Sequence, residues 1–296
     1  MDIFRNQFDA MRTSYRLTFQ KAFDAAPTLY QEFCMVDGDA AHTVLELPFL
    51  GAFTFMREWI GDRQIKNLAG RKLRLVERPF EDTIAIPRRD IETDNWGQYA
   101  HAVAQLGQSG AQLWDRLAIE ALTGAPNWID DEAFFSETRK YGNSTICNRS
   151  SAALSAASLE SAYDLMSSYC GHNGEPLGVR PTVLIVGPSL RGSARKLLEN
   201  QFMVEDGASV DNPTRDLVEY RVSPRLVGDY ADDWYLVATS GVPKPILLMK
   251  SKEASLTSLS EPTDQNVFLG NRALFGVDAY GNAAAAFPHL VYRGGR

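Results

Sequence analysis

The side chains that most often carry out catalysis or bind metals are few and scattered along this chain. Asp130, Asp131 and Glu132 are consecutive carboxylates. Such a run can chelate a hard cation, but it is more often a solvated loop. The histidines include no pair spaced to bind zinc on one helix face, and each is expected at the surface or at a cap. They are His42, His101, His172 and His289. The sequence therefore predicts no metal site.

The sequence also lacks the motifs that normally present a catalytic nucleophile. Residues 187–191 read Gly-Pro-Ser-Leu-Arg, so an arginine stands where the nucleophile elbow of a hydrolase needs its second glycine. Ser189 is expected to begin a helix instead. Gly171, Gly174 and Gly178 lack the spacing of a phosphate-binding loop. We expect no catalytic residue and no cofactor, although missing motifs do not by themselves exclude an enzyme.

The composition is that of an ordinary globular protein, with 45% hydrophobic and 23% charged residues among 296. A net charge of −7 disfavours a surface that grips nucleic acid, but it suits a container wall past which DNA moves. The three cysteines form no C-x-x-C pair, which indicates a reducing compartment. No signal peptide is visible, and no apolar run reaches the roughly 20 residues of a membrane span. We expect a protein made in a cytoplasm, with no membrane partner.

Charge is densest between residues 57 and 94, where nine basic and eight acidic residues make up 17 of the 38 positions. Alternation around Leu73 and Leu75, and again around Ile84 and Ile86, predicts two strands joined by a turn at residues 79–82. A hairpin this polar cannot form its own core. It is either a solvated ribbon or a projecting loop that docks on another copy through paired charges. The candidate inter-subunit contacts are Arg57, Trp59, Arg63, Lys72, Arg74, Glu77, Arg78 and Glu81.

Two long amphipathic helices flank this charged segment. Apolar residues recur at three- and four-residue steps from Phe4 to Phe23, and Pro27 should end that helix. This helix either packs on the subunit's own core or acts as an arm on a neighbour. A second helix is expected over residues 97–123, begun by Asp94 or Asn95 and stopped by Gly124. At 1.5 Å per residue it spans roughly 40 Å, enough to serve as a spine.

The second half of the chain alternates helices and strands. After a loop at residues 125–150, a helix at about 158–170 precedes a buried strand at 182–186 and a helix opened by Pro188. Further strands are expected at 217–222, 234–238 and 245–249, which completes an α/β lobe. Residues 251–296, including Val267 to Leu269, should add closing strands that return to the first lobe.

Several of these segments carry a specific resemblance. Residues 56–63 read Met-Arg-Glu-Trp-Ile-Gly-Asp-Arg, and Phe-Glu-Asp-Thr-Ile follows at 80–84. Together with Arg-Asp-Ile-Glu-Thr-Asp at 89–94, they closely resemble the major head (capsid) proteins of Mu-like tailed bacteriophages. Matching residues continue from Pro176 through Leu198 and return at 234–236, 244–245 and 275–278. The resemblance therefore covers most of the chain in order.

The resemblance implies the α+β fold of tailed-phage major capsid proteins, which also forms herpesvirus capsid floors and encapsulin shells. It places an N-terminal arm and the start of a peripheral lobe at residues 1–50. It then places an extended hairpin loop at 51–95, the peripheral lobe with its spine helix at 96–149, an axial α/β lobe at 150–250, and a C-terminal return to the peripheral lobe at 251–296.

The function implied is structural. Identical subunits would assemble as hexamers and pentamers into the icosahedral head of a virion, in the cytoplasm of a bacterial host. The head would enclose double-stranded DNA without sequence-specific binding. Implied partners are scaffold and protease, portal and decoration proteins. Three alternatives stay open: an encapsulin-like shell that holds enzymes, an α/β metabolic enzyme, and a tail or head-completion adaptor.

Overall fold

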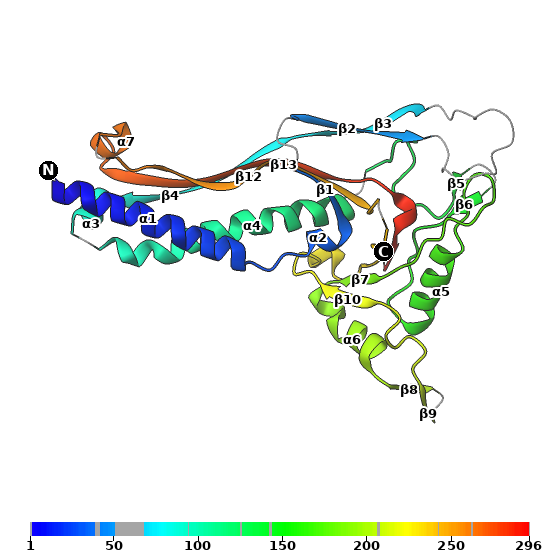
Figure 1. Ribbon diagram of the computed structural model, residues 1–296. Coiled ribbons are helices and arrows are strands. Elements are labelled where there is room, and N and C mark those ends of the chain that lie inside the picture. The colour runs from blue at the N-terminus through cyan, green and yellow to red at the C-terminus, as the bar shows by residue number, and fades with distance from the viewer. Residues whose placement is uncertain are drawn as a thin grey trace.

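The computed structural model shows an elongated lobe joined at one end to a second lobe (Figure 1). The N-terminus lies at the far tip of the elongated lobe, and the C-terminus lies close to where the two lobes join. The described residues are 2–38, 42–50, 68–93, 95–124, 126–141, 144–205, 208–241, 243–261 and 263–295.

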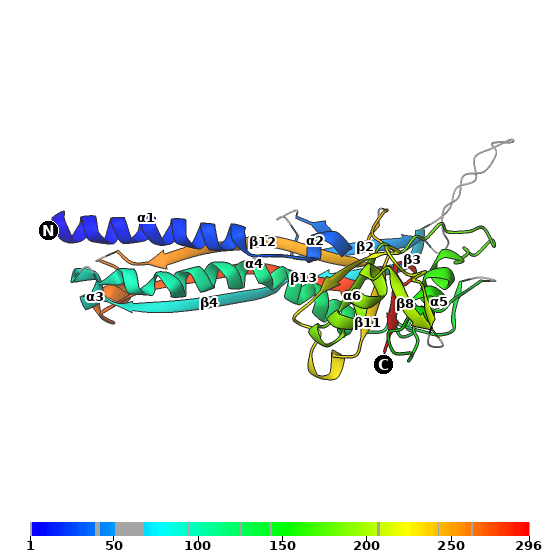
Figure 2. The same ribbon diagram turned by 90° about the horizontal axis from the view of Figure 1, so that it is seen from below.

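The elongated lobe, called the peripheral lobe below, is built on a four-stranded sheet in the order β1-β12-β13-β4. Strands β12, β13 and β4 are antiparallel neighbours, and β1 is parallel to β12. Helices α1 and α4 lie along one face of this sheet (Figure 2). The two long helices are α1 (Asp2–Ala25) and α4 (Ala100–Thr123). The strands of the sheet are β1 (Cys34–Asp37), β4 (Arg78–Pro87), β12 (Ile246–Leu259) and β13 (Arg272–Ala285). The short helices are α2 (Tyr30–Phe33), α3 (Arg88–Glu92), η1 (Trp96–Tyr99) and α7 (Gln265–Phe268).

Helix α1 packs on the subunit's own core, as one of the two predicted alternatives requires. Phe8, Met11, Tyr15 and Phe19 recur on one helix face, and all four are buried. The Tyr15 ring packs edge-on against Phe275 of β13, with the ring centroids 5.0 Å apart. The apolar face of α1 that these four residues form therefore belongs to the peripheral core.

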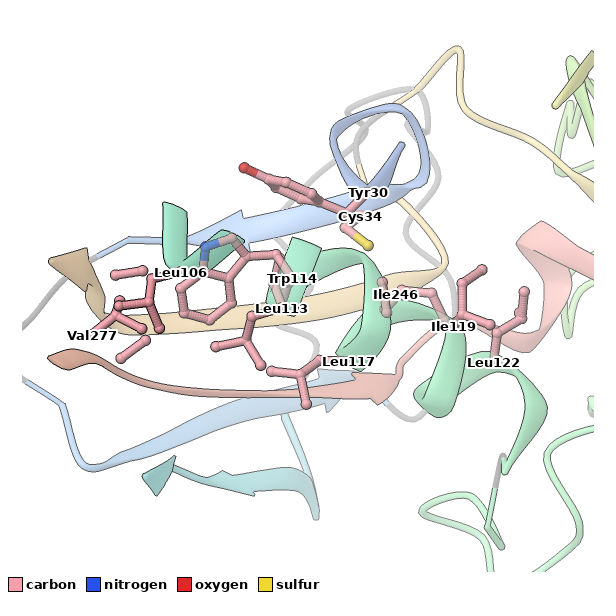
Figure 3. Packing of buried hydrophobic residues seen from close by; sticks show 14 of the residues in the cluster. Tyr30, Cys34, Leu106, Leu113, Trp114, Leu117, Ile119, Leu122, Ile246 and Val277 are labelled. Carbon is pink, nitrogen blue, oxygen red and sulfur yellow. The ribbon is translucent and has the colours of Figure 1, made fainter. Parts of the chain in front are cut away.

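Helix α4 is the predicted spine, and it begins at Ala100 directly after η1. Asn95 precedes η1 without a side-chain cap, and Asp94 lies outside the described residues. Gly124 ends the helix and donates its N–H to the carbonyl of Glu120 at 2.9 Å. The large side chains on its buried face, several of which Figure 3 labels, are Val103, Leu106, Leu113, Trp114, Leu117, Ile119 and Leu122.

Small residues let the backbones around α4 approach closely. A Cβ added to Gly107 would lie 2.5 Å from the carbonyl oxygen of Phe19, so α1 and α4 touch there through their main chains. On the sheet side, the Trp114 indole covers Gly281 of β13, where a Cβ would lie 2.7 Å from the ring. The low helix propensity of Gly107 is thus offset by close packing.

The second lobe, called the axial lobe below, contains a sheet in the order β10-β7-β11-β14. Strand β7 is parallel to β10 and antiparallel to β11. Leu184 and Val186 pack with α5 and α6 on one sheet face, while Val183 and Ile185 face the peripheral core. The helices and sheet strands are α5 (Ala156–Ser167), β7 (Val183–Val186), η2 (Pro188–Leu190), α6 (Arg191–Glu199), β10 (Glu219–Val222), η3 (Gly228–Tyr230), β11 (Trp234–Val237), η4 (Pro288–Leu290) and β14 (Val291–Gly294). Two small hairpins are β5 (Arg139–Tyr141) with β6 (Ser144–Ile146), and β8 (Phe202–Glu205) with β9 (Ala208–Asp211).

The strands predicted around Leu73 and Ile84 both form, but the prediction that they pair with each other is wrong. Strand β3 (Leu68–Val76) pairs with β2 (Val44–Leu50), and β4 pairs with β13 instead. Residues 79–82, predicted as a turn, lie inside β4. Only Glu77 separates β3 from β4, so the chain passes directly from one sheet into the other. Part of the predicted extended loop therefore belongs to the peripheral sheet.

The C-terminal third also divides between the lobes differently from the prediction. Residues 246–249 open β12 in the peripheral sheet rather than a strand of the axial lobe. Strand β14 does the reverse and pairs with β11 of the axial sheet. Val267 and Phe268 lie in α7 and not in a strand. Residues 246–249 pair with β1 on one edge and with β13 on the other, so neither edge is left for a strand of the axial sheet.

His289 lies in η4, between the peripheral strand β13 and the axial strand β14. The prediction of a surface position is wrong for this histidine, which is buried, whereas His42 and His101 are exposed as expected. Burial lowers the pKa of His289 to about 4, because the imidazolium would lose its hydration. The folded subunit therefore holds this side chain neutral at pH values where the unfolded chain begins to protonate it.

We expect this histidine to make the subunit less stable in acid. The free energy of unfolding should fall by up to about 3 kcal/mol as the pH drops from 6.5 towards 4, because only the unfolded state binds the proton in that window. Urea denaturation of the wild type and of His289→Gln across this range would isolate the effect, since all other groups titrate in both proteins. A stability difference that does not change with pH would contradict the prediction.

Candidate assembly surfaces

The acidic run at residues 130–132 has a structural role in the loop after α4. The Asp130 carboxylate forms an ion pair with Arg139, whose side chain is fully buried, and Asp131 has a left-handed backbone with φ of 67°. Within the described ranges, no group of three or more potential ligands is arranged to hold a metal ion. Ser189 begins a helical segment as predicted, and its hydroxyl donates to the carbonyl of Ala231.

A broad groove of about 1160 Å³ runs along the outer edge of β10 and reaches α2. Arg221 Nε lies 2.8 Å from a Glu32 carboxylate oxygen, and Lys244 Nζ donates to the Gln31 carbonyl at 2.5 Å. These contacts tie α2 to the axial lobe. An active site would need a nucleophile or base that converges on a substrate. In this groove, the Arg221–Glu32 and Lys244–Gln31 contacts hold the two lobes together.

The ribbon formed by β2 and β3 crosses above the junction of the lobes (Figure 1). On its inner face, Leu45 and Leu47 lie opposite Leu75 and Leu73. These leucines pack with Leu247 and its neighbours in a small cluster of their own. The ribbon is therefore anchored at its base by apolar contacts, while its other face is open.

The open face of the ribbon is charged. Glu46 lies opposite Arg74, and Lys72 Nζ lies 2.5 Å from a Glu46 carboxylate oxygen across the ribbon. Lys72, Arg74 and Glu46 are all exposed. The structure thus places two of the predicted contact residues on one exposed ribbon face, together with one acidic partner.

The other predicted contact residues lie elsewhere. Arg78 and Glu81 are exposed on β4, and the Arg78 guanidinium packs over the Phe80 ring at 5.3 Å. Glu77 joins the two strands and is half-buried. Arg57, Trp59 and Arg63 lie outside the described residues. The candidates therefore divide between the ribbon and the edge of the peripheral sheet.

Sequence reasoning missed two surface features. Glu46 was overlooked because the segment before residue 51 was not recognised as a strand. At the distal end of the peripheral lobe, Leu259, Phe268 and Leu269 expose 55%, 75% and 70% of their surface. The available signal for Phe268 and Leu269 was the short apolar run from Val267 to Leu269, which was predicted to be part of a closing strand.

Candidate membrane-spanning helices are absent from the described part of the chain. None of its helices combines the length and the apolar character needed to cross a bilayer.

Comparison with known proteins agrees with this architecture. The family model described as "Mu-like prophage major head subunit gpT" matches residues 8–145, and the model described as "Phage capsid protein" matches residues 80–293. The major capsid protein of Escherichia phage Mu is 23% identical over 297 residues, covering 73% of this chain and 97% of that protein.

Two solved structures show how widely the fold is shared. The procapsid of bacteriophage JBD30 matches with a TM-score of 0.56 at 23% identity, covering 96% of this chain and 73% of that chain. A virus-like particle from Pyrococcus furiosus matches with a TM-score of 0.56 at 10% identity, covering 95% of this chain and 98% of that chain. These likenesses establish the tailed-phage capsid fold predicted from the sequence.

The family itself is established by the match over residues 80–293, which is well over half of the chain, and by the Mu-like match that overlaps it towards the N-terminus. The chain therefore belongs to the phage capsid proteins, which are components of the virion, and over residues 8–145 it is similar to the major head subunits of Mu-like prophages.

Proposed function

We propose that this subunit assembles with copies of itself, as hexamers and pentamers, into an icosahedral shell around double-stranded DNA. The observation that carries the proposal is the β2–β3 ribbon, which buries its leucine face at the base and leaves Glu46, Lys72 and Arg74 exposed. An isolated two-stranded ribbon is marginal in water, so its open face is best stabilised by another subunit. Mixed charges on that face suit docking on an identical chain.

The charge of the whole subunit supports an enclosing role. With a net charge of −7, the wall would hold DNA without gripping its phosphates and without reading its sequence. Each exposed charge pair contributes only about 0–1 kcal/mol, so incorrect contacts can dissolve before the shell closes. We infer that the scaffold, protease, portal and decoration proteins are separate proteins that act on this subunit. We also infer that the subunit itself is not an enzyme.

Shortening the ribbon tests this role directly. Leu50 and Leu68 are paired across the ribbon, so a two-residue Asn-Gly turn can replace residues 51–67 without changing the register. Because the anchoring leucines remain, we expect an unchanged circular dichroism spectrum and melting temperature. Negative-stain microscopy and sedimentation velocity should then show subunits or small rings where the wild type, co-expressed with its flanking genes, forms closed shells. Glu46, Lys72 and Arg74 remain in the shortened chain, so Lys72→Glu with Arg74→Glu tests the open face itself. Normal shells from this charge-reversed chain would refute docking through the open face of the ribbon.

A shell that holds enzymes rather than DNA is the second candidate. It is favoured by the likeness to the virus-like particle from Pyrococcus furiosus, because the match covers nearly all of both chains. The content of purified particles separates the two. Heads made from the complete set of head genes should contain nuclease-resistant double-stranded DNA. Particles that contain protein cargo and no nucleic acid would favour the second candidate.

A further inference from the structure

The two helices on the outer face of the axial sheet carry opposite charges. Helix α6 exposes Arg191, Arg195 and Lys196, and α5 carries the half-buried Glu160 and the exposed Asp164. Within residues 156–167, α5 contains no basic residue at all. The charge of the axial lobe is therefore polarised between two neighbouring helices.

These five charged side chains form no ion pair within the described part of the subunit. Among the described residues, none of the five forms an ion pair with another side chain, although α6 also contains Glu199, which accepts a hydrogen bond from Tyr220. Arg191 and Arg195 are one helical turn apart, and so are Glu160 and Asp164. Like charges at this spacing destabilise a helix, and Arg191 in addition lies at the positive end of the α6 dipole. Glu199 and the C-terminal end of α6 offset part of this repulsion for Arg195 and Lys196, whereas Arg191 has no such compensation within the helix.

The positions of the helices make them suitable for a repeated contact. Both pack on the same sheet face, since Leu159 and Met166 of α5 share a core with Ala194 and Leu198 of α6. In Figure 1, α6 and α5 lie on opposite flanks of the axial lobe, and Figure 2 shows the same separation from below. A ring of identical subunits uses heterologous contacts, in which one flank of each copy meets the other flank of the next.

We propose that the α6 face of one subunit contacts the α5 face of the next subunit in the ring, pairing Arg195 and Lys196 with Glu160 and Asp164. The partner is thus a second copy of this chain. This inference rests on the proposed assembly into hexamers and pentamers, and it adds which surfaces meet and in which order. Opposite charges on the two flanks favour head-to-tail contacts and oppose head-to-head ones.

Charge reversal tests the contact. An α6-reversed chain carries Arg195→Glu and Lys196→Glu, an α5-reversed chain carries Glu160→Lys and Asp164→Lys, and a swapped chain carries all four changes. Each reversed chain should yield fewer rings and shells by about tenfold or more, because like charges then meet at every junction. The swapped chain should assemble like the wild type. The charge-conserving control Arg195→Lys with Lys196→Arg should also assemble normally.

Mixing gives a second readout that a folding defect cannot imitate. An equimolar mixture of the two reversed chains should form alternating hexameric rings, because every mixed junction is complementary, although neither chain assembles alone. Odd-numbered rings would contain one like-charge junction and should be depleted. If a reversal unfolds the subunit, Arg195→Gln with Lys196→Gln and Glu160→Gln with Asp164→Gln should each cause a smaller loss. An alternating ring of these two chains would regain the charge pair at every second junction.

The outcomes separate this contact from the assembly itself. A wild-type chain that stays monomeric with its flanking genes would overturn both the shell and the contact. Normal assembly of both reversed chains would overturn only the α5–α6 contact. Impaired reversed chains that neither the swap nor the mixture rescues would overturn the pairing of these two helices.

Discussion

Replacing Arg139 by alanine is expected to lower the free energy of unfolding by about 3–5 kcal/mol. The Arg139 side chain is fully buried, pairs with Asp130 and packs over the Trp128 ring at 5.1 Å. It also donates to the carbonyls of Ala133 and Phe134, which would lose this donor. A truncation therefore leaves a carboxylate without its partner and a void beside an indole. Urea denaturation under conditions that prevent assembly would measure the loss.

Two further variants show whether burial is the cause. Asp130→Asn should cost less than Arg139→Ala, because the guanidinium would keep both carbonyl acceptors. Lys72→Ala removes the exposed pair with Glu46 and should cost at most about 1 kcal/mol. If Arg139→Ala were as mild as Lys72→Ala, the buried pair would not stabilise the loop after α4.

The elements that could be predicted from the sequence are those whose burial follows a local period. Leu106, Leu113 and Leu117 recur at helical spacing over a segment long enough that no other structure accommodates them, and α4 forms there. Four consecutive apolar residues at 183–186 similarly indicated a strand covered on both faces, and β7 is buried at every position. In both cases the information lies within the element itself.

Strand partners could not be predicted in the same way. Strands β3 and β4 show the same two-residue alternation, and nothing in either one identifies its partner. Strand β4 pairs with β13, roughly two hundred residues later in the chain, whereas β3 pairs with β2 just before it. The error in the predicted hairpin arose because a local pattern specifies strand and face but not the neighbouring strand.

The candidate surface shows the same division. Lys72 and Arg74 alternate with leucines, so their exposure follows from the pattern of a single strand, and the structure confirms it. Their role as inter-subunit contacts remains a prediction. His289 shows the opposite case, since its burial depends on the meeting of β13 and β14 at the junction of the lobes. Such burial is set by tertiary structure, and a lone histidine gives no local signal of it.

Adding one methyl group at Gly294 is expected to destabilise the subunit by about 3 kcal/mol. Gly294 of β14 lies opposite Trp234 of β11, and a Cβ there would come within 2.1 Å of the indole. The indole is fully buried, and its N–H donates to the Ala152 carbonyl at 3.1 Å, so it cannot move aside. A glycine is likewise covered by an indole in the peripheral sheet, where Gly281 lies beneath Trp114. Urea denaturation of Gly294→Ala measures the effect.

A double-mutant cycle identifies the obstacle. In a Trp234→Leu background, Gly294→Ala should cost at least about 1 kcal/mol less than in the wild type, because the three atoms nearest the new Cβ all belong to the indole. Gly192→Ala on α6 is the matched control, since its Cβ would enter open space and should be neutral or stabilising. If Gly294→Ala had the same cost in both backgrounds, the indole would not be what requires glycine. The requirement would then lie in the backbone of β14, and the C-terminal strand would be held in the axial sheet by its main chain alone.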